Sequence, residues 1–212
     1  MAGLRDYAEW HKAYDDPDSG LSWRLREVQR FLEEALDRHV GPIQVLSLCA
    51  GDGRDLLSVL CGRGDAGRVD ATLIEIHPAL AERARTSARE AGLSQVEVRT
   101  LDAGDTSSYD RAAPADIVMM IGIFGNISDA DVERTVKASP QLCRPGATLL
   151  WSRGRAEDDR NAAIRTWFQE AGFSELDYVE RDVGSRPALG AMAYRGEPKA
   201  LVAGCRLFSF LR

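Results

Sequence analysis

The sequence predicts an α/β protein with a doubly wound, mostly parallel sheet of seven strands, an antiparallel C-terminal edge and an N-terminal helical cap. Three observations predict this architecture. Apolar runs alternate with amphipathic segments between residues 43 and 171, which is typical of parallel strands joined by covering helices. A Gly-rich turn at residues 49–53 follows the first apolar run. Two further apolar runs come after the last helical pattern, which favours an antiparallel pair at the edge.

The N-terminal segment, residues 1–40, is predicted to form a helical cap or lid on a main domain of residues 41–212. Apolar positions spaced by three and four indicate an amphipathic helix over residues 21–39, which ends near Gly41-Pro42. The preceding stretch combines aromatic and charged residues, among them Tyr7, Trp10, His11 and Tyr14.

The remaining elements follow from the same two periodicities. Strands are expected at residues 43–49, 70–75, 95–101, 115–123 and 146–152. Helices are expected at residues 53–62, 78–91, 129–142 and 160–171. The two late strands are expected at residues 176–179 and 206–210, joined by a Gly- and Pro-rich linker over residues 184–198. This pair either completes the sheet or joins a second copy of the chain, so a homodimer stays open.

Composition narrows the classes of partner. A chain of 212 residues with 44% hydrophobic content is long enough for one compact core. The 27 basic and 33 acidic residues give a net charge of −6, which disfavours nucleic acid as a partner. No apolar stretch is long enough to span a bilayer, and the four cysteines form no CxxC pair. We therefore expect a cytoplasmic protein with reduced thiols, no membrane partner and no metal.

The Gly-rich turn and a carboxylate downstream predict a nucleoside site. Glycine allows close approach of a ligand to the backbone, and the following helix start offers free N–H groups. The second strand ends in Glu75, about 20 residues after the turn, where a doubly wound sheet places the carboxylate that binds ribose hydroxyls.

The order of these motifs resembles that of the class I S-adenosylmethionine-dependent methyltransferases, which have a Rossmann-like fold. Residues 45–53 look like the family's first motif, and Glu75 matches its ribose-binding acid. Residues 101–103 match the position that reads the adenine edge, residues 115–124 look like the strand leading to the transferring methyl, and residues 144–150 are similar to the turn into strand five. Two residues depart from the pattern: Ser47 replaces the usual acid, and Cys49 replaces the first glycine.

The resemblance implies S-adenosyl-L-methionine as the cofactor and a catalytic role for residues 41–212. The residues that it places around the cofactor are Cys49, Ala50, Gly51, Asp52, Gly53, Glu75, Ile76, Asp102, Ala103, Gly122 and Phe124. A dinucleotide is the alternative ligand for such a turn, but the third glycine of that motif would be Leu56. Asp52 and Asp55 would also direct negative charge at a diphosphate, which favours the sulfonium cofactor.

Methyl transfer from a sulfonium depends mostly on positioning the nucleophilic atom against the methyl carbon. A base is needed only when that atom carries a proton that it does not lose by itself. The catalytic candidates are His11 as the base, Tyr14 as a wall of the site, and Arg153 as a clamp for a carboxylate or phosphate. The structural alternatives are that the aromatic residues only attach the leading helix, and that Arg153 pairs with the acidic run at residues 157–159.

The acceptor class is narrowed by motifs that the sequence lacks. No Asn/Asp-Pro-Pro-aromatic or Pro-Cys motif of nucleic-acid methylation is present, and the end of strand five lacks the acidic and amide pair of a magnesium site. Residues 122–126 predict an apolar slot with one amide, suited to a small organic molecule. We expect metal-independent methylation of an O or N atom of such a molecule. A non-methylating enzyme of the same fold and a non-catalytic cofactor-binding regulator are the alternatives.

Overall fold

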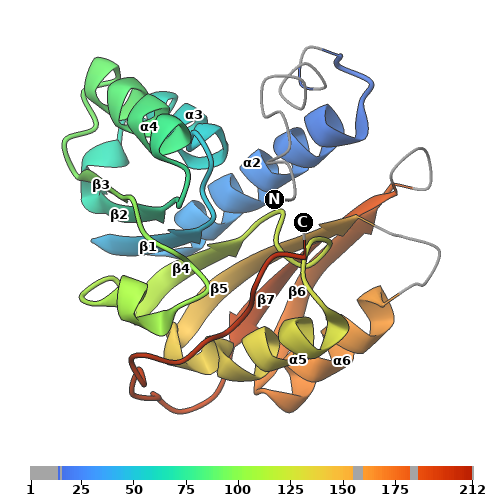
Figure 1. Cartoon of the computed structure of the whole chain (residues 1–212). Coiled ribbons are helices and arrows are strands. Elements are labelled where there is room, and N and C mark those ends of the chain that lie inside the picture. The colour runs from blue at the N-terminus through green and yellow to red at the C-terminus, as the bar shows by residue number, and fades with distance from the viewer. Residues whose placement is uncertain (1–13, 15, 155–159, 182–185, 212) are drawn as a thin grey trace.

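In the computed structural model of the chain, the described residues are 14, 16–154, 160–181 and 186–211. Their strands form one seven-stranded sheet in the order β3-β2-β1-β4-β5-β7-β6 (Figure 1). The strands are β1 (Ile43–Leu48), β2 (Val69–Ile74), β3 (Val96–Arg99), β4 (Ala115–Met120), β5 (Cys143–Gly154), β6 (Phe173–Glu180) and β7 (Pro187–Tyr194). The helices are α2 (Gly20–Arg38), α3 (Arg54–Cys61), α4 (Pro78–Glu90), α5 (Asp129–Ala138) and α6 (Asn161–Glu170).

The direction of the strands confirms the predicted fold class. The first five strands pair in parallel, while β7 is antiparallel to both β5 and β6. The carboxyl ends of β1 to β5 therefore meet at one edge of the sheet, where doubly wound proteins bind their ligands.

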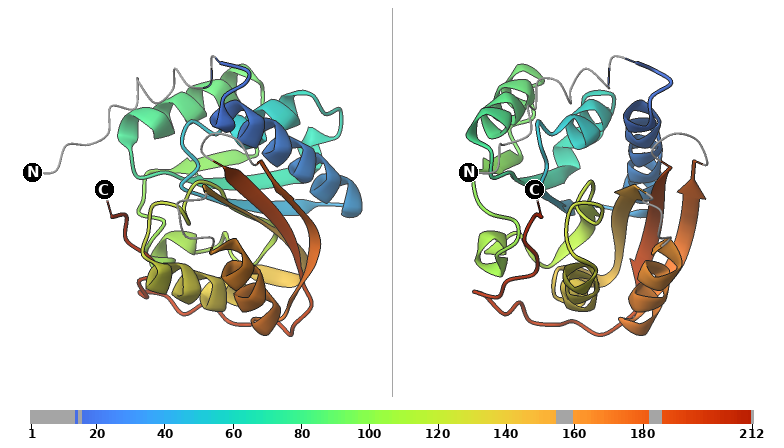
Figure 2. Two further views of the ribbon diagram at one scale, coloured as in Figure 1. Left: turned by 90° about the vertical axis from the view of Figure 1, so that its right-hand side faces the viewer. Right: turned by 45° about the vertical axis from the view of Figure 1, so that its right-hand side comes forward.

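Helices cover both faces of the sheet, with α2, α3 and α4 on one face and α5 and α6 on the other (Figures 1 and 2). Each face carries its own hydrophobic cluster: Val28, Leu32 and Leu60 belong to the first, and Trp151 and Phe168 to the second. Burial on both faces explains why the strands appear in the sequence as almost continuous apolar runs.

The helix predicted over residues 21–39 is α2, and it belongs to the main core. Ser19 caps its N-terminus by accepting the Ser22 N–H at 3.0 Å. Its buried side chains, including Phe31 and Leu36, join the cluster that also contains Ile43 of β1. The division at residue 40 remains a prediction, because residues 1–13 and 15 lie outside the described residues.

The C-terminal strands differ from the prediction. Residues 187–194, expected as part of a linker, form β7, and all eight are buried. Alanine and glycine have low strand propensity, so this segment carries no strand signal in the sequence. Small side chains are nevertheless required there, because a Cβ on Gly190 would lie 2.6 Å from Cε2 of the buried Trp151.

Residues 206–210, expected as a strand, lie outside the sheet. They make only isolated bridges, Arg206 to Asp105 and Phe210 to Ile127. The adjacent Leu207 and Phe208 are both buried, so the segment does not have the two-residue alternation of a strand. The helix predicted over residues 129–142 is also shorter: α5 ends at Ala138, and a 3-10 turn that contains Pro140 follows.

Within the described residues, no helix combines the length and apolar content that a bilayer crossing requires.

Candidate cofactor and acceptor site

The turn at residues 49–53 leaves the carboxyl end of β1 in a conformation that depends on glycine. Gly51 and Gly53 have φ values of 60° and 74°, and Cys49 also has a positive φ, of 52°. A Cβ on Gly53 would lie 2.8 Å from Leu73 Cδ2, so a side chain would clash there. A Cβ on Gly51 would meet no atom within 4 Å. The backbone at Gly51 is therefore open to a ligand, as the cofactor prediction requires.

Glu75 links this turn to the end of β2. Its side chain is buried, with 6% of the residue exposed. Oε2 accepts the Gly51 N–H and Oε1 accepts the His77 N–H, both at 2.8 Å. An ionised carboxylate has about four acceptor sites, so each oxygen retains capacity for a second donor such as a ribose hydroxyl.

Asp52 forms an ion pair that sequence reasoning missed. The Arg54 guanidinium donates from Nε to Oδ1 at 2.9 Å and from Nη2 to Oδ2 at 2.6 Å. The negative charge of Asp52 is therefore compensated, and the charge argument against a diphosphate rests on Asp55 alone. The short spacing between Asp52 and Arg54 is a local signal that could have revealed this pair.

A polar cluster from α2 and α3 lies beside the turn. Arg24 Nη2 donates to the Tyr14 hydroxyl at 2.9 Å, and the Arg54 guanidinium carbon lies 4.3 Å from the centroid of the Tyr14 ring. Arg24 also reaches the end of β4, because its Nη1 lies 3.4 Å from the position of a Cβ on Gly122. Tyr14 thus contacts Arg54, which follows the turn, and Arg24, which lies beside Gly122.

Burial raises the pKa of two groups in this cluster. Desolvation raises the pKa of the Tyr14 hydroxyl, with Asp55 adding to it and Arg24 opposing it. Tyr14 therefore keeps its proton near neutral pH and can donate a hydrogen bond, but it is a poor base. Desolvation also raises the pKa of the half-buried Asp55 carboxyl, again opposed by Arg24.

The loop after β3 presents the predicted adenine-reading residues. Asp102 Oδ1 accepts the Gly104 N–H at 2.8 Å, and Oδ2 accepts from Arg206 Nη1 at 2.5 Å. Ala103 is buried, and its carbonyl accepts the Tyr109 hydroxyl. Two apolar residues that follow β2 and β3, Ile76 and Leu101, are 59% and 44% exposed, so their side chains are available for contact with a flat apolar ligand.

The loop after β4 differs from the apolar slot that was predicted for residues 122–126. Gly122 donates its N–H to Ser152 Oγ at 2.9 Å, and its carbonyl accepts from Asn126 Nδ2 at 2.8 Å. Ile123 and Phe124 are 0% and 1% exposed. They belong to the hydrophobic cluster on the α5 and α6 face, so these two side chains line no open slot.

Of the two other catalytic candidates, the structure describes Arg153. Arg153 is 9% exposed and lies 3.8 Å from Oδ1 of Asp129, which also pairs with Arg160 at 3.1 Å. This contact places the guanidinium near the start of α5, while Tyr14 contacts residues of α2 and α3. His11 and the acidic run at residues 157–159 lie outside the described residues.

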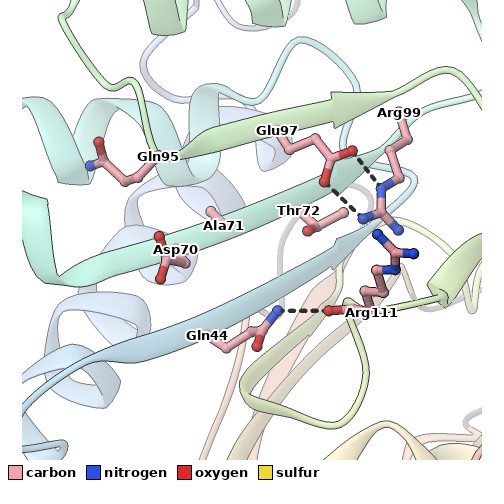
Figure 3. A pocket seen from close by; sticks show the side chains of 8 residues that line it. All are labelled: Gln44, Asp70, Ala71, Thr72, Gln95, Glu97, Arg99 and Arg111. Carbon is pink, nitrogen blue, oxygen red and sulfur yellow. Dashed lines mark hydrogen bonds and ion pairs between the residues drawn. The ribbon is translucent and has the colours of Figure 1, made fainter.

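A polar cavity of about 360 Å³ lies away from this site, over β1, β2 and β3 (Figure 3). Its charged side chains are partly paired with each other, as Glu97 and Arg99 are at 2.8 Å (Figure 3). None of its lining residues belongs to the predicted cofactor site. Among the residues that the structure describes, no group of three or more His, Cys, Asp or Glu side chains is arranged to hold a metal ion.

The fold is that of a Rossmann-like protein, with the Gly-rich turn and the buried Glu75 at the carboxyl edge of its sheet. Residues 21–178, most of the chain, match a family model described as a methyltransferase domain. The chain belongs to this methyltransferase family. The predicted class of S-adenosylmethionine-dependent methyltransferases, with S-adenosylmethionine as the methyl donor, is thereby confirmed. A comparison with curated protein sequences finds no match.

Solved structures of several enzymes are similar to the chain. The magnesium protoporphyrin IX methyltransferase ChlM from Synechocystis PCC 6803, solved with bound S-adenosylmethionine, has a TM-score of 0.69 at 13% identity, and the match covers 92% of this chain and 99% of that one. The 1,6-didemethyltoxoflavin-N1-methyltransferase from Burkholderia thailandensis has a TM-score of 0.63 at 17% identity, covering 92% of both chains. The cyclase SpnF has a TM-score of 0.58 at 17% identity, covering 79% of this chain and 80% of that one. At such identities the likeness shows the fold alone, and the same fold serves a cyclase as well as methyltransferases.

Proposed function

We propose that the protein transfers a methyl group from S-adenosylmethionine to an O or N atom of a small organic molecule. The observation that carries this proposal is Glu75, a buried carboxylate fixed beside the open backbone of Gly51. This arrangement supports a nucleoside whose ribose hydroxyls donate to Glu75. When bound, the cofactor supplies a methyl carbon already activated by the positive sulfur.

We assign each part of the cofactor to different residues around the turn. We assign the ribose to Glu75, the faces of the adenine to Ile76 and Leu101, and its edge to Asp102 and the backbone of Ala103. The turn at residues 49–53 and Gly122 form the floor beneath the amino-acid portion. The Arg24 guanidinium beside Gly122 suits the carboxylate of that portion.

The chemical step then needs little beyond orientation and the exclusion of water. We propose His11 as the base for acceptors whose nucleophilic atom must lose a proton, and Tyr14, whose hydroxyl stays protonated near neutral pH, as a hydrogen-bond donor. Arg153 remains the proposed clamp for an anionic group of the acceptor, acting from the end of β5. The core position of Phe124 leaves its side chain no ligand contact in this proposal, so it acts only through packing.

A small acceptor is supported by both charge and fold relatives. The net charge of −6 disfavours polyanionic substrates. Two similar structures are methyltransferases that are named for a porphyrin and a toxoflavin precursor, which are small organic molecules. A cytoplasmic location and a homodimer stay predictions alongside this proposal.

Titration with S-adenosylhomocysteine tests the cofactor assignment. Glu75→Ala removes the ribose contact, and hydrogen bonds to a charged group contribute about 1.5–3 kcal/mol, so affinity should fall by about 10- to 150-fold. Glu75→Gln keeps one acceptor oxygen for the backbone and should bind with intermediate affinity. Glu97→Gln, a carboxylate change at the distant cavity, is the matched control and should bind like the wild type. If Glu75→Ala and Glu75→Gln fold and bind S-adenosylhomocysteine as tightly as the wild type does, Glu75 does not hold the ribose.

Product analysis tests the reaction itself. Incubation with S-adenosylmethionine and a panel of small hydroxylated and amine compounds should yield S-adenosylhomocysteine together with a product one methylene heavier. Methylthioadenosine would instead indicate transfer of the aminocarboxypropyl group. Tight cofactor binding without turnover on any compound would favour a regulator.

A further inference from the structure

The C-terminal segment reaches the proposed adenine site from far along the chain. We call residues 201–211 the C-terminal strap. It begins seven residues after the last residue of β7, passes α5 and ends near the loop after β4 (Figures 1 and 2). Val202 donates its N–H to Gln141 Oε1 at 2.8 Å, in the 3-10 turn that follows α5, and Leu211 donates its N–H to the Asn126 carbonyl at 2.9 Å.

The middle of the strap pairs with the loop after β3. Thr106 donates its N–H to the Cys205 carbonyl at 3.0 Å, and Leu207 donates its N–H to the Gly104 carbonyl at 2.8 Å. The Leu207 carbonyl accepts from Arg134 Nη1 at 3.2 Å on α5. Leu207 is 3% exposed, so this part of the strap packs into the hydrophobic core.

Gly104 shows how closely the strap approaches this loop. A Cβ on Gly104 would lie 2.7 Å from Arg206 Nη1 and 3.1 Å from Asp102 Oδ1, and it would also clash with the Phe208 carbonyl. Only glycine leaves room for Arg206 to reach Asp102 at this point.

Arg206 fixes the orientation of the Asp102 carboxylate. Oδ1 is held by the Gly104 N–H and Oδ2 by Arg206, so each oxygen has one partner on the protein side. Two fixed partners define the plane of the carboxylate, while its remaining lone pairs stay available because the side chain is 43% exposed. Ser108 Oγ also donates to the Asp102 carbonyl at 2.7 Å, which holds the backbone of the same residue.

We propose that Arg206 is a positioning residue for base recognition, which holds Asp102 so that its free lone pair accepts a hydrogen bond from the 6-amino group of adenine. The inference rests on the proposed function, in which Asp102 reads the adenine edge. It makes the C-terminal strap part of the cofactor specificity, although the strap lies about 100 residues from Asp102 in the sequence. A purely structural ion pair would stabilise the fold without favouring one base over another.

The test compares two ligands that differ only at this edge. S-adenosylhomocysteine presents an amino donor, while S-inosylhomocysteine presents an oxygen that accepts and would face the Asp102 carboxylate. The wild type should prefer the adenine ligand. Arg206→Ala should reduce the preference, measured as the ratio of the two dissociation constants, by about tenfold, which corresponds to the loss of one well-aligned hydrogen bond. Arg206→Lys keeps the charge without the planar guanidinium and should restore part of the preference.

Control variants separate the possible failures. Arg134→Ala removes a strap contact on the α5 side without touching Asp102, so it should lower stability and leave the preference ratio unchanged. If Asp102→Ala keeps the wild-type preference, Asp102 does not read adenine and that part of the proposed function fails. If Asp102→Ala abolishes the preference but Arg206→Ala weakens both ligands equally, only the role of Arg206 is overturned. Should Arg206→Ala not fold, Arg206→Gln and Arg206→Lys give the same comparison.

Discussion

At the scale of single residues, the site is built from charged groups that are held by partners rather than left in solvent. Glu75 is fixed by two backbone N–H groups, and Asp52 by the guanidinium of Arg54. Asp55 is the exception, because no side-chain hydrogen bond to its carboxylate is present among the described residues. Burial therefore disfavours the charged form of Asp55, and we expect this cost to be detectable in the pH dependence of stability.

The raised pKa of Asp55 predicts a pH-dependent change in stability. Its pKa is higher in the folded than in the unfolded chain, so the folded state binds more protons between these two values. The stability contributed by the protonated form is therefore lost as pH rises through the folded pKa. We expect Asp55→Asn to unfold at a higher temperature than the wild type at pH 7, with the difference shrinking toward pH 4.

Asp70→Asn serves as the control for this prediction, because Asp70 is exposed on β2. The free energy of unfolding of Asp70→Asn should differ from that of the wild type by no more than about 0.5 kcal/mol at both pH values. A stability gain for Asp55→Asn that is equal at pH 4 and pH 7 would contradict the proposed cost of the desolvated charge.

The residues that sequence analysis identified share one property: their role is set by a short stretch of chain. The turn at residues 49–53 and Glu75 follow from the strand and glycine pattern. The proposed roles of Arg24 and Arg206 could not be predicted in this way, because they depend on contacts with Gly122 and Asp102, which lie about 100 residues away in the sequence.

At the scale of elements, the difference between β7 and the C-terminal strap shows the limit of propensity. The strap contains an apolar run that is typical of a strand, yet it makes only isolated bridges. The Ala- and Gly-rich β7 pairs on both sides and is entirely buried. The position of β7 in the sheet explains its composition better than strand propensity does, because a strand that packs against Trp151 needs small side chains.

This explanation predicts that β7 tolerates no added methyl group at Gly190. Gly190→Ala places a Cβ against the buried indole of Trp151, and overpacking of this kind costs about 1–3 kcal/mol. Urea unfolding should show that loss. Gly64→Ala is the matched control, since a Cβ there meets no atom within 4 Å and should change stability little. Equal unfolding midpoints for the two variants would mean that Trp151 does not set the composition of β7.

At the scale of the whole molecule, two hydrophobic clusters hold helices on both faces of one sheet. This arrangement leaves the carboxyl edge of β1 to β5 for ligands, and it follows from alternating apolar and amphipathic segments that the sequence shows directly. The fold class and the cofactor turn could therefore be predicted. The proposed acceptor side could not, because the positions of Arg24 on α2 and of Gly122 after β4 depend on contacts between distant segments, which no local pattern specifies.

A crystal structure of the protein with S-adenosylhomocysteine tests the central claim most directly. We expect both ribose hydroxyls within hydrogen-bond distance of Glu75, the adenine edge at Asp102, and the amino-acid portion above residues 49–53. A nucleoside bound anywhere else, for instance in the polar cavity over β1, β2 and β3, would contradict the claim.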